Sequence, residues 1–144
     1  MKIKLLQLGD DHHHIAATRL LNEGAELSLE RSQELLRDST YLFVVALTND
    51  DEIMGRVYGH ILHRFGQTDL LLYEVDVLEE YQRQGAGRAM IEFLRKYSKE
   101  HHFAEMWVLA EGSNSGARGF YESVDGREED SPAIIYILSA KEAI

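Results

Sequence analysis

Apolar and polar residues divide the chain into segments of two kinds. Dense or alternating apolar runs between turn residues predict strands at about 2–8, 41–48, 53–65, 70–77, 104–110 and 132–139. Helical spacing and cap residues predict helices at about 10–22, 27–37, 85–101 and 114–123. No linker, repeat or low-complexity segment separates these elements. We therefore expect one α/β domain, residues 1–144, with helices flanking a mixed sheet.

The net charge of the chain limits the kinds of binding partner that we expect. The chain has 25 acidic and 15 basic side chains, a formal net charge of −10. Nucleic acid is not expected as a partner, because phosphate binding requires a basic face. A cationic small molecule would be attracted by the acidic field, although many proteins are acidic for solubility alone.

The lengths of the apolar segments predict no membrane-spanning helix, so we expect no membrane among the binding partners. None approaches the roughly 18 residues of a membrane span. The first six residues lack the features of a signal peptide, so a cytoplasmic location is expected.

The chain contains no cysteine. Disulfides, thiolate metal sites and a cysteine acyl-enzyme are thereby excluded. His12, His13 and His14 would point about 100° apart on a helix, so they cannot converge on one metal ion. We expect a solvated helix start there and predict no metal site.

A loop with two glycines stands where the helix of residues 85–101 begins. It consists of Gln82, Arg83, Gln84, Gly85, Ala86, Gly87 and Arg88. Gly85 and Gly87 permit positive φ and close backbone approach, and the amides that begin a helix can hold a pyrophosphate. Arg83 and Arg88 would add positive charge. A plain glycine-containing turn would look the same, and the spacing matches neither a Walker loop nor a dinucleotide fingerprint.

Two motifs resemble those of the GCN5-related N-acetyltransferase (GNAT) superfamily. Gln82, Gly85 and Gly87 fill the places of its acyl-CoA signature, Gln/Arg-x-x-Gly-x-Gly/Ala. Downstream, Asn114, Ala117 and Tyr121 match its pattern Asn-x-x-Ala-x-x-x-Tyr. The resemblance implies the GNAT fold, a mixed and mostly antiparallel sheet flanked by helices, and acetyl-CoA as the acetyl donor.

The resemblance also implies where the donor binds. The backbone of Val75, Asp76 and Val77 would pair with the pantetheine arm, and residues 82–88 would hold the pyrophosphate. Asn114 and Ala117 would lie at the cofactor, and the Tyr121 hydroxyl would lie near the thioester sulfur.

Acetyl transfer requires a base to deprotonate the amine and an acid to protonate the departing thiolate. Glu74 is the preferred base because a carboxylate is costly in its apolar strand, and Asp76 is the alternative. The two should share a strand face about 7 Å apart, although either could simply form a salt bridge. Tyr121 is the candidate acid, unless it is a core tyrosine. Backbone N–H groups of Val75 or Val77 would stabilise the oxyanion, and without cysteine the transfer should be direct within a ternary complex.

The acceptor is suggested by a further resemblance, to small aminoglycoside 3-N-acetyltransferases of type I. It rests on residues 62–67, on Tyr73-Glu74 at the place of a Tyr-Asp pair, and on residues 126–129. A cationic amine, as in an aminoglycoside, is thus the expected small-molecule substrate. The alternatives are another small amine, a polyamine or a peptide N-terminus, and a CoA-binding module without catalysis.

Four other features receive an interpretation. His60 or His63 could contact substrate, and the acidic run 128–130 either is a solvated loop or grips a cation. Trp107 is expected in the core. The apolar run 134–138 is compatible with a homodimer, as in other family members.

Overall fold

A computed structural model describes residues 1–22, 25–129 and 134–140. The chain forms two compact units, Met1–Leu109 and Ala110–Ile144, and each is described by itself. The described residues contain no helix long and apolar enough to cross a membrane.

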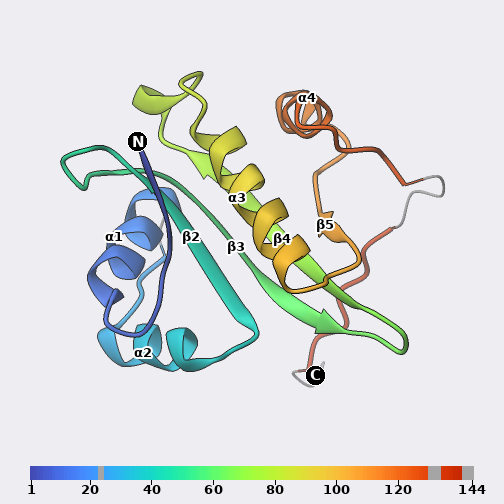
Figure 1. The fold of residues 1–144 in the computed structure, drawn as a ribbon, viewed down its shortest axis with the longest axis horizontal. Helices are drawn as coiled ribbons and strands as arrows, with labels where there is room; N and C mark the ends of the chain where they lie inside the picture. Colours follow the sequence, from blue (N-terminus) through green and yellow to red (C-terminus); the bar gives the residue numbers. More distant parts are fainter. Residues whose placement is uncertain (23–24, 130–133, 141–144) are drawn as a thin grey trace. The chain divides into compact units, whose positions relative to one another are not determined.

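The first unit is a five-stranded sheet with three α-helices (Figure 1). The strands are β1 (Lys2–Leu5), β2 (Tyr41–Leu47), β3 (Ile53–His63), β4 (Thr68–Val77) and β5 (Met106–Val108). The helices are α1 (Asp11–Leu21), α2 (Leu29–Arg37) and α3 (Ala86–Glu100), with a short 3-10 helix, η1, at Glu79–Tyr81. The sheet order is β1-β2-β3-β4-β5, with β4 and β5 parallel and every other pair antiparallel. The predicted mixed, mostly antiparallel sheet is confirmed.

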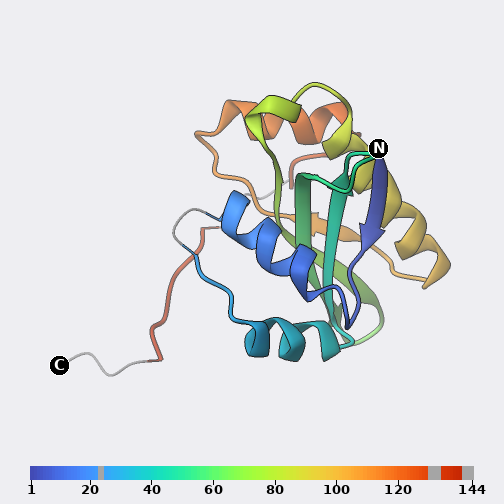
Figure 2. The ribbon, with the colours of Figure 1, turned by 90° about the vertical axis from the view of Figure 1, so that its left-hand side faces the viewer.

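Helices cover both faces of this sheet (Figure 2). The α1 and α2 helices pack on one face, where a core cluster includes Ala17, Phe43 and Val45. The α3 helix packs on the other face, across β2, β3 and β4, and buries Met90 and Leu94. The 2.0-residue period of the strands therefore sorts each strand's side chains into two separate cores.

A β-bulge interrupts the pairing of β3 with β4. Tyr58 lies opposite Glu74. The next β3 residue, Gly59, lies opposite Leu72, so Tyr73 has no partner of its own. An extra residue shifts the side-chain alternation by one, and the consecutive residues Tyr73 and Glu74 thus emerge on the same face of the sheet.

Gly59 is required at this bulge. A Cβ atom at position 59 would lie 2.0 Å from the carbonyl oxygen of Leu71, far inside contact distance. Only glycine permits this approach of the two backbones, so the bulge and the direction of Glu74 depend on it.

The predicted elements of the first unit are confirmed with shifted ends, except near residue 104. The predicted strand 104–110 shortens to Met106–Val108, because β5 pairs with β4 only over three residues. The prediction of a solvated helix start is wrong for His14, which is 1% exposed. Its ring nitrogens lie 2.8 Å from Ser32 Oγ and 2.8 Å from the Tyr41 hydroxyl, so the helix faces inward at this position.

The second unit contains one helix among its described residues, α4 (Ser115–Ser123). The prediction of a strand at 132–139 is wrong for residues 134–139, which have no strand structure. A strand requires a hydrogen-bonding neighbour, and apolar β-propensity alone does not supply one. Residues 132 and 133 lie outside the described residues, as does Asp130.

Candidate active site

Two carboxylates on β4 share one buried guanidinium. The Arg56 side chain, on β3, is fully buried, whereas those of Glu74 and Asp76 are 53% and 45% exposed. One guanidinium nitrogen lies 2.9 Å from Glu74 Oε2, and the other lies 3.0 Å from Asp76 Oδ2. The shared face predicted for Glu74 and Asp76 is thus observed, and each carboxylate is half open to solvent.

Asn22 anchors the same guanidinium from the other side. This residue ends α1, and its Oδ1 accepts from Arg56 Nε at 3.2 Å and from Arg56 NH2 at 2.7 Å. The guanidinium also lies over the Tyr58 ring, 5.1 Å from its centroid, at a distance typical of a cation–π contact. Arg56 therefore connects α1, β3 and β4 at one point.

The two carboxylates differ in their surroundings. Burial raises the pKa of Asp76, and Glu74 beside it also raises it, while the charge of Arg56 acts in the opposite direction. Asp76 also faces a pocket and Glu74 does not line it. Asp76 is consequently the carboxyl that holds a proton more readily than an ordinary aspartate does.

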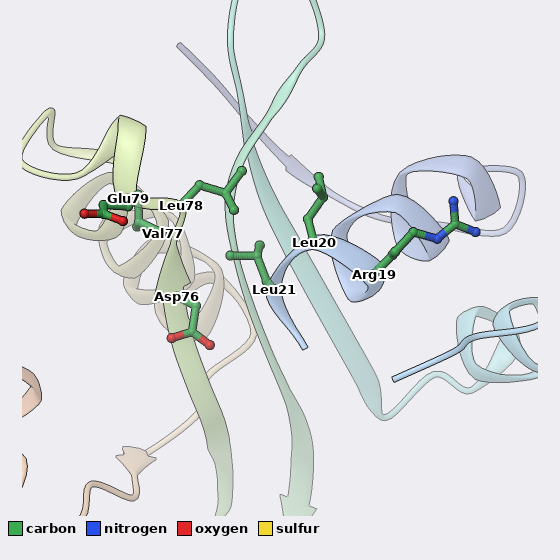
Figure 3. Close-up of a pocket in the computed structure, with 7 residues that line it drawn as sticks. All are labelled: Arg19, Leu20, Leu21, Asp76, Val77, Leu78 and Glu79. Carbon is green, nitrogen blue, oxygen red and sulfur yellow. The ribbon is translucent and has the colours of Figure 1, made fainter. Parts of the chain in front are cut away.

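That pocket lies between the end of α1 and the end of β4 (Figure 3). Its volume is about 450 Å³, and its lining residues are Arg19, Leu20, Leu21, Asp76, Val77, Leu78 and Glu79. The lining is mixed, with apolar leucines beside the carboxylates of Asp76 and Glu79, and the Arg19 guanidinium points away from the strand. Asp76 therefore stands at a surface where apolar and charged side chains adjoin.

Tyrosines and a histidine extend the carboxylate face along the sheet. Tyr73 is the extra residue of the bulge, and its hydroxyl lies 3.1 Å from His60 Nδ1. The rings of Tyr58 and Tyr73 lie 5.3 Å apart. His63 pairs instead with Thr68, at 3.2 Å. Of the two histidines proposed to contact substrate, only His60 thus reaches a residue beside the carboxylates.

The glycine loop leads into α3 as the sequence predicted, with one correction. Gly85 is the N-cap of α3 with φ +87°, and no side chain caps the helix. Gly87 lies in the first turn and is buried, and its φ is not positive. Arg83 carries the second positive φ of the loop, +63°. Open space surrounds the position where a Gly85 Cβ would be, so a ligand can approach the helix amides there.

Other loop residues hold the loop in place. The Gln82 side chain donates to the Val77 carbonyl at 3.1 Å, and Gln84 donates to the Glu80 carbonyl at 3.3 Å. Ala86 is buried, while Arg88 is exposed at the helix start. The first turn of α3 contains no acidic residue, so its positive dipole end is not neutralised from within the helix.

Beyond Leu72, the edge of β4 that faces β5 has no strand paired with it among the described residues. The pairing with β5 ends at Leu72 and Val108, whereas β4 continues to Val77. Leu70 donates its amide toward the β5 side, to Glu105. Val75 lies on the same sheet face as Leu70. Along a strand, the direction of the backbone amide alternates together with the side-chain face, so residues on one face have amides that point the same way.

It follows that the amides of Val75 and Val77 point to the side where β5 has ended. An extended ligand can pair with these two amides, whereas the amide of Asp76 points to the opposite side, toward β3.

The remaining predicted residues lie in the second unit. Asn114 Oδ1 accepts from the Ala117 amide at 3.0 Å and so caps α4. The Tyr121 ring packs edge-on against Phe120, with centroids 5.3 Å apart. Glu128 forms an ion pair with Arg118 at 3.1 Å. Asn114 therefore has a structural role as the N-cap of α4.

Sequence reasoning missed Arg56 and Asn22. A signal was available, because an arginine flanked by apolar and glycine residues at 53–59 requires partners when it is buried. Asp69 was missed as well. It is fully buried and accepts from Arg64, Gln67 and Trp107, which ties the β3–β4 hairpin to β5. Trp107 has this structural contact but is only partly buried, so the expected core position is met only in part.

The glycine-capped helix α3 and the end of the β4–β5 pairing at Leu72 are consistent with the acyltransferase fold that the GNAT resemblance implies. The sequence profile of the acetyltransferase (GNAT) family matches residues 10–126. The chain therefore belongs to the acetyltransferase (GNAT) family, whose enzymes use acetyl-CoA.

The relatives that the chain resembles are named for two different kinds of acceptor. The [ribosomal protein bS18]-alanine N-acetyltransferase of Escherichia coli (strain K12) is 37% identical over 74 residues, 51% of this chain and 50% of the relative. The matched segment thus spans about half the length of this curated relative. The aminoglycoside acetyltransferase meta-AAC0020 from an uncultured soil metagenomic sample, in complex with sisomicin, has a TM-score of 0.86. It is 25% identical, with 96% of each chain covered.

A third similarity concerns the fold alone. The structure of AAC(6')-Iy in complex with a bisubstrate analogue, CoA-S-monomethyl-acetylneamine, has a TM-score of 0.83. It is 16% identical, with 96% of this chain and 98% of that chain covered.

Proposed function

We propose that this protein is an N-acetyltransferase that moves the acetyl group of acetyl-CoA to a primary amine of a cationic small molecule of the aminoglycoside class. Transfer takes place directly in a ternary complex. The observation that carries the proposal is the pair of half-exposed carboxylates, Glu74 and Asp76, on the strand that precedes the glycine-capped helix. Carboxylates at that place can both bind an ammonium group and take its proton.

The proposed transfer makes one carbon–nitrogen bond and breaks one carbon–sulfur bond. Glu74 takes a proton from the bound ammonium, and the free amine attacks the carbonyl carbon of the thioester. The tetrahedral oxyanion receives hydrogen bonds from the amides of Val75 or Val77. The carbon–sulfur bond then breaks, and the CoA thiolate gains a proton from the Tyr121 hydroxyl. The new amide nitrogen loses its extra proton, which restores the Tyr121 hydroxyl, and Glu74 releases its proton to solvent.

Steady-state acetylation of a panel of amines tests the acceptor class. Gentamicin, spermidine and a peptide with N-terminal alanine are each offered with acetyl-CoA. We expect gentamicin and spermidine to exceed the peptide in kcat/KM, because a −10 protein with two half-exposed carboxylates favours a polycation. We expect gentamicin to exceed spermidine because of the similarity to an aminoglycoside acetyltransferase, and a higher kcat/KM for spermidine would refute the aminoglycoside class. Turnover of the peptide alone would refute the aminoglycoside proposal and favour the second candidate.

That second candidate is acetylation of an N-terminal alanine. It is favoured by the 37% identity over 74 residues to an enzyme that is named for this reaction. Glu74 and Tyr121 would keep their roles, since only the acceptor changes.

The variants Glu74→Gln and Asp76→Asn identify the base. We expect Glu74→Gln to lower kcat by about 100-fold, since general-base catalysis contributes 10²–10⁴-fold, and Asp76→Asn to lower it less. The reverse order would make Asp76 the base. Full activity in both variants would exclude a carboxylate base on β4, and a wild-type protein that binds CoA but transfers no acetyl group would favour a binding module.

A further inference from the structure

The net charge of the side-chain cluster around Arg56 determines which ligand charge can bind beside it. Its members are two carboxylates, Glu74 and Asp76, and one guanidinium, with the neutral Asn22 amide closing the fourth side. Together they carry one uncompensated negative charge. One ammonium group would therefore neutralise the cluster, and two carboxylates without Arg56 would instead repel each other.

The geometry leaves room for that ammonium. Arg56 contacts Oε2 of Glu74 and Oδ2 of Asp76, from the buried side of the sheet. Both carboxylates are about half exposed, so their solvent side is available to a ligand. The bulge at Tyr73 contributes, because it brings Glu74 onto the face where Arg56 lies.

Arg56 is fixed more firmly than the carboxylates that it holds. Its side chain is fully buried and is bonded on the α1 side by Asn22 through two of its nitrogens. A planar guanidinium with two anchored nitrogens presents its other donors in fixed directions, which a lysine cannot do. The positions of Glu74 and Asp76 thus follow from Arg56 rather than from their own strand alone.

We propose that Arg56 is a positioning residue for acetyl transfer: it holds Glu74 and Asp76 side by side and leaves them a single net negative charge for the acceptor ammonium. This inference rests on the proposed function. Arg56 itself touches no reacting atom and acts through the two carboxylates.

The pH profile of kcat/KM for the acceptor tests the role in the variants Arg56→Met and Arg56→Lys. In Arg56→Met we expect kcat/KM to fall by about 10- to 100-fold, the cost of a misplaced reacting group. The acid limb of the profile, which is the fall of kcat/KM at low pH, should move to higher pH by about one unit. The reason is that loss of the positive charge raises the pKa of the neighbouring carboxylates. Arg56→Lys should restore the acid limb, since it keeps the charge, but not the full rate. The KM for acetyl-CoA should stay within twofold in both.

The other charged or titratable groups around the cluster are unchanged in these variants. They are Tyr58 and His60 on β3, Tyr73 on β4, Glu79 beyond β4, and Arg19 on α1. A shift of the acid limb in Arg56→Met that is absent in Arg56→Lys therefore reports the guanidinium charge.

Two further variants separate positioning from stability. Asn22→Ala removes the anchor on α1 and leaves the carboxylate contacts, so it should lower the melting temperature without moving the acid limb. Arg31→Met removes one positive charge from a surface pair with Glu34 and controls for net charge, with kcat/KM within twofold of wild type.

The inference is overturned if an active wild type and Arg56→Met share the same acid limb, or if Asn22→Ala moves it as far as Arg56→Met does. If Arg56→Met does not fold, Arg56→Lys decides the question alone. A lysine that gives the wild-type rate would then show that the planar guanidinium is not needed, and would overturn the inference. A wild type that acetylates no amine refutes the proposed function instead. In that case NMR titration of the Glu74 and Asp76 carboxyls, in wild type and Arg56→Met, still tests the pairing.

Discussion

Replacement of the buried His14 by glutamine should remove a large part of the acid sensitivity of the fold. Burial lowers the pKa of His14 from 6.5 to about 4, with the nearby Asp11 charge acting in the opposite direction. Its neutral ring bridges Ser32 and Tyr41, and burial raises the pKa of Tyr41, so that hydroxyl stays protonated. The folded protein therefore keeps the His14 imidazole in its neutral form.

The size of the effect follows from the two pKa values. Between pH 6.5 and about 4, the unfolded chain binds a proton at position 14 and the folded chain does not. Stability is thus fully present above pH 6.5 and falls as the pH drops through this window. Integration from pH 7.5 to pH 4.5 gives a loss of about 2.5 kcal/mol. Such a loss is a large fraction of the typical stability of a domain.

Urea denaturation of wild type and His14→Gln at a series of pH values measures this loss. We expect wild type to lose about 2.5 kcal/mol more than the variant between pH 7.5 and 4.5, because the other titrating groups are common to both. His12→Gln is the matched control, since that neighbour is exposed, and it should follow wild type. Equal losses in wild type and His14→Gln would refute the reasoning, because the imidazole would then titrate alike in both states.

Two glycines allow further tests. Gly59→Ala should destabilise the protein by about 3 kcal/mol in urea denaturation, because its Cβ would lie 2.0 Å from the Leu71 carbonyl oxygen. Gly66→Ala is the control, with nothing within 4 Å and a change of about 0.5 kcal/mol or less, and equal effects would contradict the bulge argument. Gly85→Ala, at φ +87°, should cost about 1 kcal/mol and raise the KM for acetyl-CoA several-fold in steady-state kinetics. An unchanged KM would argue against donor binding at the start of α3.

The sequence by itself determined the local features of this protein. Period and cap residues located the helices and the long strands, because these signals act over a few residues. The loop 82–88 and the pattern at 114–121 indicated the acetyltransferase family, which the family match confirmed. Glu74 and Asp76 were placed on one face by the two-residue period of a strand, and the register with β3 agrees.

Tertiary structure alone decided which residues meet. The partner of both carboxylates, Arg56, lies 18 residues from Glu74 in sequence, and no local pattern specifies that pairing. The inward position of His14 depends on α1 packing against the sheet, and the apolar run 134–138 forms no strand because a strand requires a neighbour. Local chemistry therefore fixed the family and its candidate groups, whereas long-range contacts set the charge and geometry in which those groups would act.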